Sequence, residues 1–419
     1  MAAAVCLPAI LIRAGVISIS VEIETLLYGV AVMGSAFLLS WGAEVAQLDI
    51  SQSLAIAFLA FVAVLPEYAV ALVFAWKAGV QDRIAAAAGQ TVRVIVPGPA
   101  PCGGSPGHPT ACRDLALANM TGANRLLIGV GWAVVVLIWW RKSGEKQVTL
   151  GERRRTELGY LLLATLWAFT IPIRGNVSMI DLVVLGTIFV AYVWHAANDE
   201  AEEPVLIGPP LAIAALAKQR RRIVTFVMFL FAAGVILLAA EPFADGLVST
   251  GERLGVDKFL LVQWLAPLAS EAPEMIIAIL FVMRLKPQAG LGTLVSSKVN
   301  QWTLLVATIP VVYSIAHHSV TPMTLGGRQV EEVFLTAAQS VFAIAVLANL
   351  SLSRGEAVLL LVTFLAQFGF EQTSVRYGFS VFFIAAALTI VITRKENRSG
   401  LGATVRAGLA PPWKPRPPG

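Results

Sequence analysis

The sequence is poor in charge and in cysteine. Only 14% of its 419 residues are Asp, Glu, Lys or Arg, whereas 57% are hydrophobic and the mean hydropathy is +0.76. This composition excludes an ordinary soluble domain and an intrinsically disordered chain. Three cysteines, Cys6, Cys102 and Cys112, are too few for a disulfide framework and lack the spacing of a metal site. The composition therefore indicates a membrane protein.

Other features that drive chemistry are also absent from the sequence. There is no Gly-x-x-x-x-Gly-Lys phosphate-binding loop, which argues against ATP-driven transport. The four histidines have no spacing typical of metal ligands, and no nucleophile motif is present. The net charge of +5 lies in short loops rather than along one face, so it does not indicate nucleic-acid binding. We expect no enzyme, no cofactor and no nucleic-acid partner, and leave the oligomeric state open.

Long apolar runs are abundant. Each is long enough to cross about 30 Å of hydrocarbon as a helix. Eleven of them lie near residues 24–46, 53–77, 114–140, 157–173, 178–196, 223–241, 258–284, 291–315, 332–351, 355–372 and 377–393. The stretch 3–19 could add a twelfth span or be a signal-like start, and we favour a retained helix although Arg13 interrupts it. The sequence thus predicts an all-α polytopic membrane protein with 11 or 12 transmembrane helices.

The basic residues predict the orientation of these spans. They cluster in short connections at 141–156, 218–222, 284–286, 354 and 393–398. Placing every cluster in the cytoplasm satisfies the positive-inside rule with strict alternation of the spans, and makes the C-terminus cytoplasmic. We expect an integral protein of a prokaryotic plasma membrane. The Gly- and Pro-rich loop 79–113 is then external, where Cys102 and Cys112 either form a disulfide or remain free thiols.

Two apolar runs carry a Pro-Glu pair at their centre. These are residues 60–76, which contain Glu67, and residues 265–281, which contain Glu274. A carboxylate at mid-bilayer depth is costly unless it faces a cavity, pairs with a cation or binds one. The preceding proline removes a backbone donor and leaves carbonyl oxygens without partners. We therefore predict a cation site; the alternative is a structural ion pair with a buried Lys or Arg.

Each Pro-Glu run is followed by a run with Asn in its first half, at 114–132 and at 294–310. The connection between the two runs is external in the first half of the chain and cytoplasmic in the second. The halves are therefore repeats of opposite orientation. Inverted repeats that meet at the bilayer midplane are typical of secondary transporters, because two opposed halves can rock about a central site.

These repeats resemble the alpha-repeats of the cation/calcium exchanger superfamily, which includes sodium/calcium and proton/calcium exchangers. In that family each repeat reads approximately G-[TS]-S-x-P-E, then a hairpin, then G-N-x-x-G-S-N-x-x-[ND]. Residues 63–67 and 270–274 keep the Pro-Glu of the first element. In the second element, residues 118–124 keep both Asn and the second Gly, whereas residues 294–300 keep only the final Asn.

The resemblance implies a ten-helix core of two inverted five-helix repeats and a secondary active antiporter that works by alternating access. It makes Glu67 and Glu274 the central ligands of the cation, since a hard divalent cation takes six to eight oxygens. Further amide and hydroxyl ligands would come from Asn119, Thr121, Asn124, Ser270, Ser296 and Asn300. For the Asn residues the alternative role is hydrogen bonding between helices.

The substrate stays open at this point: Ca²⁺ or Na⁺ would be exchanged against H⁺ or Na⁺. The first repeat has Ala63 and Val64 where the family has hydroxyls, which weakens the case for sodium. In the second repeat Glu271 precedes Glu274 by three residues, so both carboxyl groups lie on one helix face. Two such groups in a low dielectric cannot easily both ionise, which suits proton exchange. A membrane-embedded sensor or enzyme and a cation channel are the alternative functions.

Two basic residues near the predicted site allow two interpretations each. Lys298 either pairs with Glu271 as a built-in cation or reaches a cytoplasmic helix end and the interface. Arg125 directly follows Asn124 and is either a counter-ion of the site or directed away from it.

The expected organisation divides the chain near its midpoint. Its parts are an N-terminal half at 1–196 with the first alpha-repeat at about 53–140, a cytoplasmic linker at 197–222, a C-terminal half at 223–398 with the second alpha-repeat at about 258–315, and a disordered Pro-rich tail at 399–419.

Overall fold

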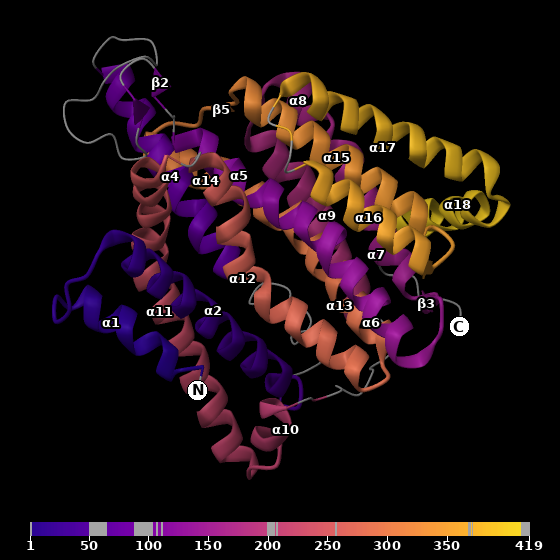
Figure 1. The fold of residues 1–419 in the computed structure, drawn as a ribbon, viewed down its shortest axis with the longest axis horizontal. Coiled ribbons are helices and arrows are strands. Elements are labelled where there is room, and N and C mark those ends of the chain that lie inside the picture. The colour runs from indigo at the N-terminus through magenta and orange to yellow at the C-terminus, as the bar shows by residue number, and fades with distance from the viewer. Residues whose placement is uncertain are drawn as a thin grey trace.

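The chain forms a bundle of helices (Figure 1). The computed structural model describes residues 2–49, 65–87, 104–105, 108–109, 112–198, 206, 208–255, 258–367, 370 and 372–411. Ala63, Val64 and Cys102 lie outside these ranges. The helices are η1 (Ala4–Cys6), α1 (Leu7–Arg13), α2 (Val21–Ala46), α4 (Leu65–Ala87), α5 (Cys112–Leu126), η2 (Leu127–Trp132), α6 (Ala133–Ser143), α7 (Arg154–Ala168), α8 (Thr170–Arg174), α9 (Met179–Ala197), α10 (Pro209–Ala214), α11 (Lys218–Leu254), α12 (Lys258–Met283), α13 (Pro287–Asn300), η3 (Gln301–Leu305), α14 (Val306–His317), α15 (Gly327–Leu347), α16 (Arg354–Ala366), α17 (Thr373–Thr393) and α18 (Lys395–Leu409).

Strands are few and very short. They are β1 (Gly104–Ser105), β2 (His108–Pro109), β3 (Gln147–Thr149), β4 (Asn176–Val177), β5 (Met323–Thr324) and β6 (Ser351–Ser353). They form three antiparallel pairs, β1 with β2, β3 with β6 and β4 with β5. The last two pairs join loops of the two halves of the chain, and so tie the halves together at both ends of the bundle.

The apolar helices confirm the predicted all-α membrane fold. Within the described ranges, eight helices are long and apolar enough to cross a membrane, and α12 makes a ninth if its two bent segments form one span. Its segments Leu260–Ala272 and Glu274–Met283 meet at 49°, with Pro273 at the break. Loss of the proline backbone donor accounts for such a bend. The described part of α16, in the predicted span 355–372, is a helix of 13 residues.

The stretch 3–19 contains a helix, and this helix is too short to be a twelfth span by itself. The helix there covers only Ala4–Arg13, about 15 Å at the rise of an α-helix, which is half the hydrocarbon thickness. It packs against α2 instead, where the buried Cys6 thiol contacts the carbonyl of Ala31 and the hydroxyl of Ser35.

Most of the basic loops meet at one end of the bundle. Strand β3 lies in the loop after α6 and pairs with β6, which precedes α16. Lys142 at the end of α6 donates to the carbonyl of Met283 at the end of α12. Arg394, after α17, pairs with Glu356 in the first turn of α16. The structure thus brings the predicted cytoplasmic loops 141–156 and 284–286 together with residues 354 and 393–394, as the alternation of spans requires.

The opposite end carries the connections predicted to be external. There the pair β4–β5 joins the loop after α8 to the loop after α14. Arg83 near the end of α4 bonds His318, and Arg113 in α5 donates to Thr324 at 2.7 Å. Helix α4 therefore runs towards this end and α12 runs away from it. The two Pro-Glu helices are antiparallel, which is the geometry of inverted repeats.

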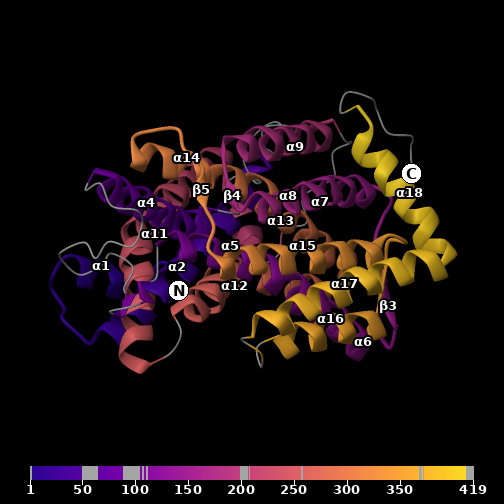
Figure 2. The same ribbon diagram turned by 90° about the horizontal axis from the view of Figure 1, so that it is seen from above.

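The predicted disordered tail is partly wrong. Residues Lys395–Leu409 form α18, which packs against α7 and lies at the edge of the bundle (Figure 2). Gly159 and Gly408 allow this contact, because a Cβ on either would lie within 3 Å of the other's backbone. The amide of Asn397 donates to the carbonyls of Ala345 and Val346, which satisfies the C-terminal end of α15. Residues 412–419 lie outside the described ranges.

Of the two cysteines predicted either to form a disulfide or to remain free, the structure describes Cys112. Cys112 is disulfide-bonded and Cys6 is a free thiol. Because Cys102 lies outside the described residues, the Cys102–Cys112 pairing stays a prediction.

Candidate cation site

Three buried glutamates from the two Pro-Glu helices form the centre of the candidate site. Glu67 lies in the first turn of α4, while Glu271 and Glu274 lie one turn apart on α12. Their exposed fractions are 1%, 0% and 6%. The carboxyl groups of Glu67 and Glu271 lie close enough to interact, although they are some two hundred residues apart in sequence, and Glu274 interacts electrostatically with both.

Polar groups from neighbouring helices surround these carboxyl groups. The Ser270 hydroxyl contacts the carboxyl group of Glu67. The side chain of Asn119 on α5 donates to the Glu67 carbonyl at 3.3 Å. Gln301, at the start of η3, donates its amide to Glu271. Helices α4, α5, α12 and η3 therefore all contribute to one polar cluster inside an apolar bundle.

Several oxygens in and beside this cluster are buried and have no hydrogen-bond partner in the described part of the chain. They are Oε2 of Glu67, Glu271 and Glu274, Oδ1 of Asn119 and Asn300, and Oε1 of Gln263 and Gln301. A buried acceptor without a partner is destabilising by about 1–3 kcal/mol. Carboxylate and amide oxygens are the ligands that hard cations prefer. Unpaired oxygens of this kind are what a transient cation site requires.

A cation would need more than the carboxylates. Among the residues that the structure describes, no group of three His, Cys, Asp or Glu side chains is placed to hold a metal ion. Amide and backbone oxygens would have to complete the coordination shell.

Lys298 forms hydrogen bonds with Asn124, which is one of the predicted ligands. It is completely buried, so it does not reach the interface. Its ammonium donates to Oδ1 of Asn124 at 2.9 Å and to the Asn124 carbonyl at 3.3 Å, and lies over the ring of Trp302. It also interacts electrostatically with Glu271. Lys298 is therefore buried beside the carboxyl cluster, and its Nζ holds the Asn124 oxygen.

Two predicted hydroxyl ligands have other partners. Thr121 donates to the carbonyl of Leu117 and accepts from Gln263 at 3.4 Å. Ser296 bonds Glu157 at 3.0 Å and Arg154 at 3.1 Å, at the other side of α13 from the carboxyl cluster. The structure thus brings Glu67, Asn119, Ser270 and Glu271 into direct contact and takes the Ser296 hydroxyl to α7.

Both Asn-containing spans change to π-helix at the site. The segment η2 begins three residues after Asn124, and η3 begins directly after Asn300. Single π-helical turns within α-helices are frequent at functional sites, because they shift side chains out of the regular register. Each repeat therefore has a π-helical segment shortly after its Asn.

Arg125 is directed away from the carboxyl cluster. It pairs with Glu332 on α15 and donates to Gln367 after α16. Of the two interpretations from the sequence, the second is therefore confirmed.

Sequence reasoning missed Gln263 and Gln301, which are both fully buried. A glutamine inside an apolar run was the available signal, and Gln301 follows Asn300 directly.

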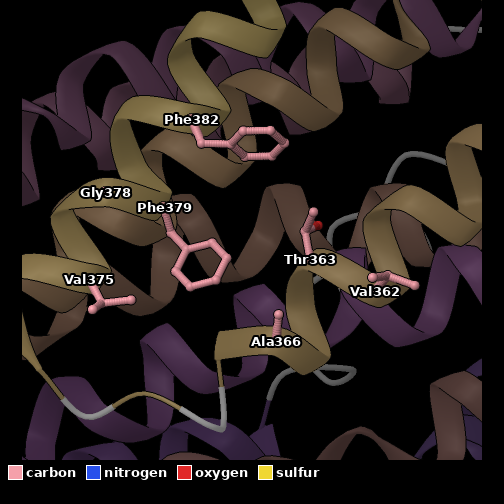
Figure 3. Close-up of a pocket in the computed structure, with 7 residues that line it drawn as sticks. All are labelled: Val362, Thr363, Ala366, Val375, Gly378, Phe379 and Phe382. Carbon is pink, nitrogen blue, oxygen red and sulfur yellow. The ribbon is translucent and has the colours of Figure 1, made fainter.

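The structure also has an apolar cavity of about 390 Å³ between α16 and α17, away from the carboxyl cluster (Figure 3). Its lining contains no charged side chain: Val362, Thr363, Ala366, Val375, Gly378, Phe379 and Phe382. It is therefore not a second candidate for a cation site.

Known proteins resemble this chain in sequence and in fold. The family described as "Sodium/calcium exchanger protein" matches residues 224–371. The crystal structure of an H⁺/Ca²⁺ exchanger, CAX, is 41% identical, with a TM-score of 0.85 over 97% of this chain and 96% of that chain. A search of curated protein sequences found no match.

Two more distant structures share the fold. They are YfkE, with a TM-score of 0.59 over 91% of this chain and 98% of that chain, and the sodium-calcium exchanger NCX_Mj, with 0.51 over 84% and 99%. Both are 15% identical to this chain. Sequence identity and coverage with CAX establish the relationship. The protein is an integral membrane transporter of inorganic cations rather than an enzyme, it works as an antiporter, and it belongs to the cation/calcium exchanger superfamily.

Proposed function

We propose that this antiporter exchanges Ca²⁺ for H⁺. The observation that carries the proposal is the clustering of three buried carboxyl groups, those of Glu67, Glu271 and Glu274, from the two Pro-Glu helices. Negative charges this close together in a buried site repel each other, so they are not all ionised when no cation is bound. A cation that binds Glu67 and Glu271 must displace the proton that they hold, which couples the two ions at one site.

Calcium fits the oxygens better than sodium does. Two carboxylates compensate the charge of a divalent cation, and the unpaired amide oxygens of Asn119 and Gln301 supply further ligands. Similarity to CAX, an H⁺/Ca²⁺ exchanger, supports the same pair of ions here. NCX_Mj, a sodium-calcium exchanger, is only 15% identical to this chain, so it supports the fold alone.

We also propose that the end of the bundle with Lys142 and Arg394 faces the cytoplasm. The concentration of basic loops there supports this orientation. The loop 79–113 would then be external and the C-terminus cytoplasmic.

Transport by purified protein in proteoliposomes tests the proposed ions. Uptake of radiolabelled Ca²⁺ should follow an imposed proton gradient and should be unaffected by a sodium gradient at constant pH. If a sodium gradient alone drives uptake, the counter-ion is Na⁺ rather than H⁺. If uptake depends on neither gradient, the protein is a channel.

Substitution of the carboxylates tests the site. Glu67→Gln and Glu274→Gln keep the side-chain volume and remove a charge that Ca²⁺ needs. Loss of one partner of a buried charge costs about 3–5 kcal/mol, so transport should fall at least about 100-fold. Glu241→Gln is the matched control, since Glu241 is a half-exposed carboxylate on α11. Wild-type rates in both site variants, with Glu241→Gln also active, would make the carboxylates structural.

A further inference from the structure

A second group of charged side chains is buried beside the candidate cation site. It consists of Arg125 on α5, Glu331 and Glu332 on α15 and Arg376 on α17, and none of these is more than 4% exposed. Buried ionised groups are costly unless each is paired. In this group, which we name the arginine–glutamate network, two guanidinium groups face two carboxylates, and Arg328 of α15 acts electrostatically on both arginines from nearby.

The contacts within the network form a chain across three helices. Arg125 Nη2 lies 2.6 Å from Glu332 Oε2. Arg376 contacts the other oxygen of Glu332, and its Nε lies 3.2 Å from Glu331 Oε1. Glu332 thus bridges the two arginines.

Arg125 makes two more contacts. Its Nη1 donates to Gln367 at 3.0 Å, and its guanidinium lies 4.9 Å from the ring centroid of Trp264 on α12. A planar guanidinium with several fixed donors orients its helix more strictly than a flexible ammonium does. One side chain therefore ties α5 to α12, α15 and the end of α16.

Arg125 lies directly after Asn124 on α5, so its contacts affect how α5 faces the site. Consecutive residues of an α-helix point about 100° apart, so Asn124 faces Lys298 while Arg125 faces α15. The π-helical η2 begins two residues later and interrupts the regular hydrogen-bond ladder. The ion pair of Arg125 lies immediately before this interruption and holds the last turn of α5 against α15.

We propose that the arginine–glutamate network positions α5 for cation binding, with Glu332 acting through Arg125 as a positioning residue. The network sets the rotation of α5, and so the placement of the Asn119 oxygen against the transported cation and of Asn124 against Lys298. This inference rests on the proposed function only for the identity of that cation. The second repeat has no such anchor at the corresponding place, because Gln301, which follows Asn300, bonds Glu271 inside the site.

Glu332→Gln tests the proposal, because it keeps the shape of the bridge and removes its charge. We expect the dissociation constant for Ca²⁺, measured on purified full-length protein with radiolabelled Ca²⁺, to rise roughly 10–100-fold, as for other residues that orient a ligand. In proteoliposomes the KM for Ca²⁺ should rise likewise, while the rate at saturating Ca²⁺ should change less than about threefold.

Asp181→Asn is the matched control. Asp181 is fully buried at the start of α9 and pairs with Arg174, away from α5. Its substitution should lower the melting temperature without changing the dissociation constant for Ca²⁺. If Glu332→Gln behaves in the same way, the network is only structural and the proposal is wrong.

The double variant Arg125→Gln with Glu332→Gln keeps the test decisive if the single variant fails to fold. It leaves Arg376 paired with Glu331, so the remaining charges balance. A folded double variant with weakened Ca²⁺ binding supports the positioning role, and one with wild-type affinity overturns it. Failure of the proposed function is a different result, since wild-type protein would then show no proton-driven Ca²⁺ uptake.

Discussion

Replacing Gly122 by Ala tests how closely the two repeats approach each other. Gly122 lies on α5 against α12, and a Cβ at this position would be 1.7 Å from the carbonyl oxygen of Gln263. That atom belongs to the backbone and cannot rotate away. Ordinary van der Waals contact begins at 3.4 Å, so the two helices would have to separate by about 1.7 Å.

The expected cost follows from two effects. Overpacking of a well-packed interface destabilises by about 1–3 kcal/mol. The separation also breaks the hydrogen bond from Gln263 to Thr121, which adds about 1 kcal/mol. The free energy of unfolding should therefore fall by about 2–4 kcal/mol. Because Asn119 moves with α5, and a displacement of about 1 Å can cost 100-fold in rate, Ca²⁺ transport should fall by about that factor.

Thermal unfolding in detergent and uptake in proteoliposomes measure the two effects. Gly234→Ala in α11 is the control, because no atom lies within 4 Å of its added Cβ. Alanine is the better helix former, so this variant should be as stable as the wild type or up to about 1 kcal/mol more stable. A Gly122→Ala protein with wild-type stability and transport would refute the close contact between α5 and α12.

Three further outcomes are expected. Single cysteines at Glu145 and at Val320 should be labelled from opposite sides of the membrane, with Glu145 protected in intact cells; labelling of both from outside would refute the proposed orientation. Glu271→Gln removes the group that shares a proton with Glu67, so Ca²⁺ uptake should reach its maximum at lower pH, and an unchanged pH profile would exclude this coupling. The Arg221 guanidinium holds the pKa of Asp49 below its ordinary value of about 3.9, so this pair stabilises the fold above that pH and loses its effect as pH falls through the lowered pKa. Asp49→Asn should therefore be less stable than wild type at pH 7, and the difference should begin to shrink as pH falls below about 4; a constant difference would show that the carboxylate acts by packing alone.

The spans, the two Pro-Glu helices and their opposite directions could be predicted because each depends on local composition. A long apolar run predicts a membrane-spanning helix whatever its neighbours in the bundle, and basic loops predict the cytoplasmic side of the membrane. The break in α12 at Pro273 follows from the missing backbone donor in the same way.

The partners of individual polar residues could not be predicted, since they depend on the rotation of each helix in the bundle. Ser296 and Asn300 are four residues apart, yet the Ser296 hydroxyl bonds Glu157 on α7. The pairing of Arg125 with Glu332 joins residues more than two hundred positions apart, and nothing local to either marks the other. Helix α18 was missed for a related reason: it is held by glycine contacts and by Asn397, whereas its own sequence has little apolar character.

The inverted repeats are alike in backbone and different in chemistry. Each places an Asn just before a π-helical segment, but the residue that follows the Asn is Arg125 in one repeat and Gln301 in the other. A guanidinium cannot lose its charge, so at position 301 it would neutralise Glu271 permanently and compete with the transported cation. A glutamine at 125 could not form the ion pair that joins α5 to α15. The asymmetry therefore places an anchoring side chain in the first repeat and an amide that faces the carboxyl cluster in the second, although the two spans share one backbone plan in opposite orientations.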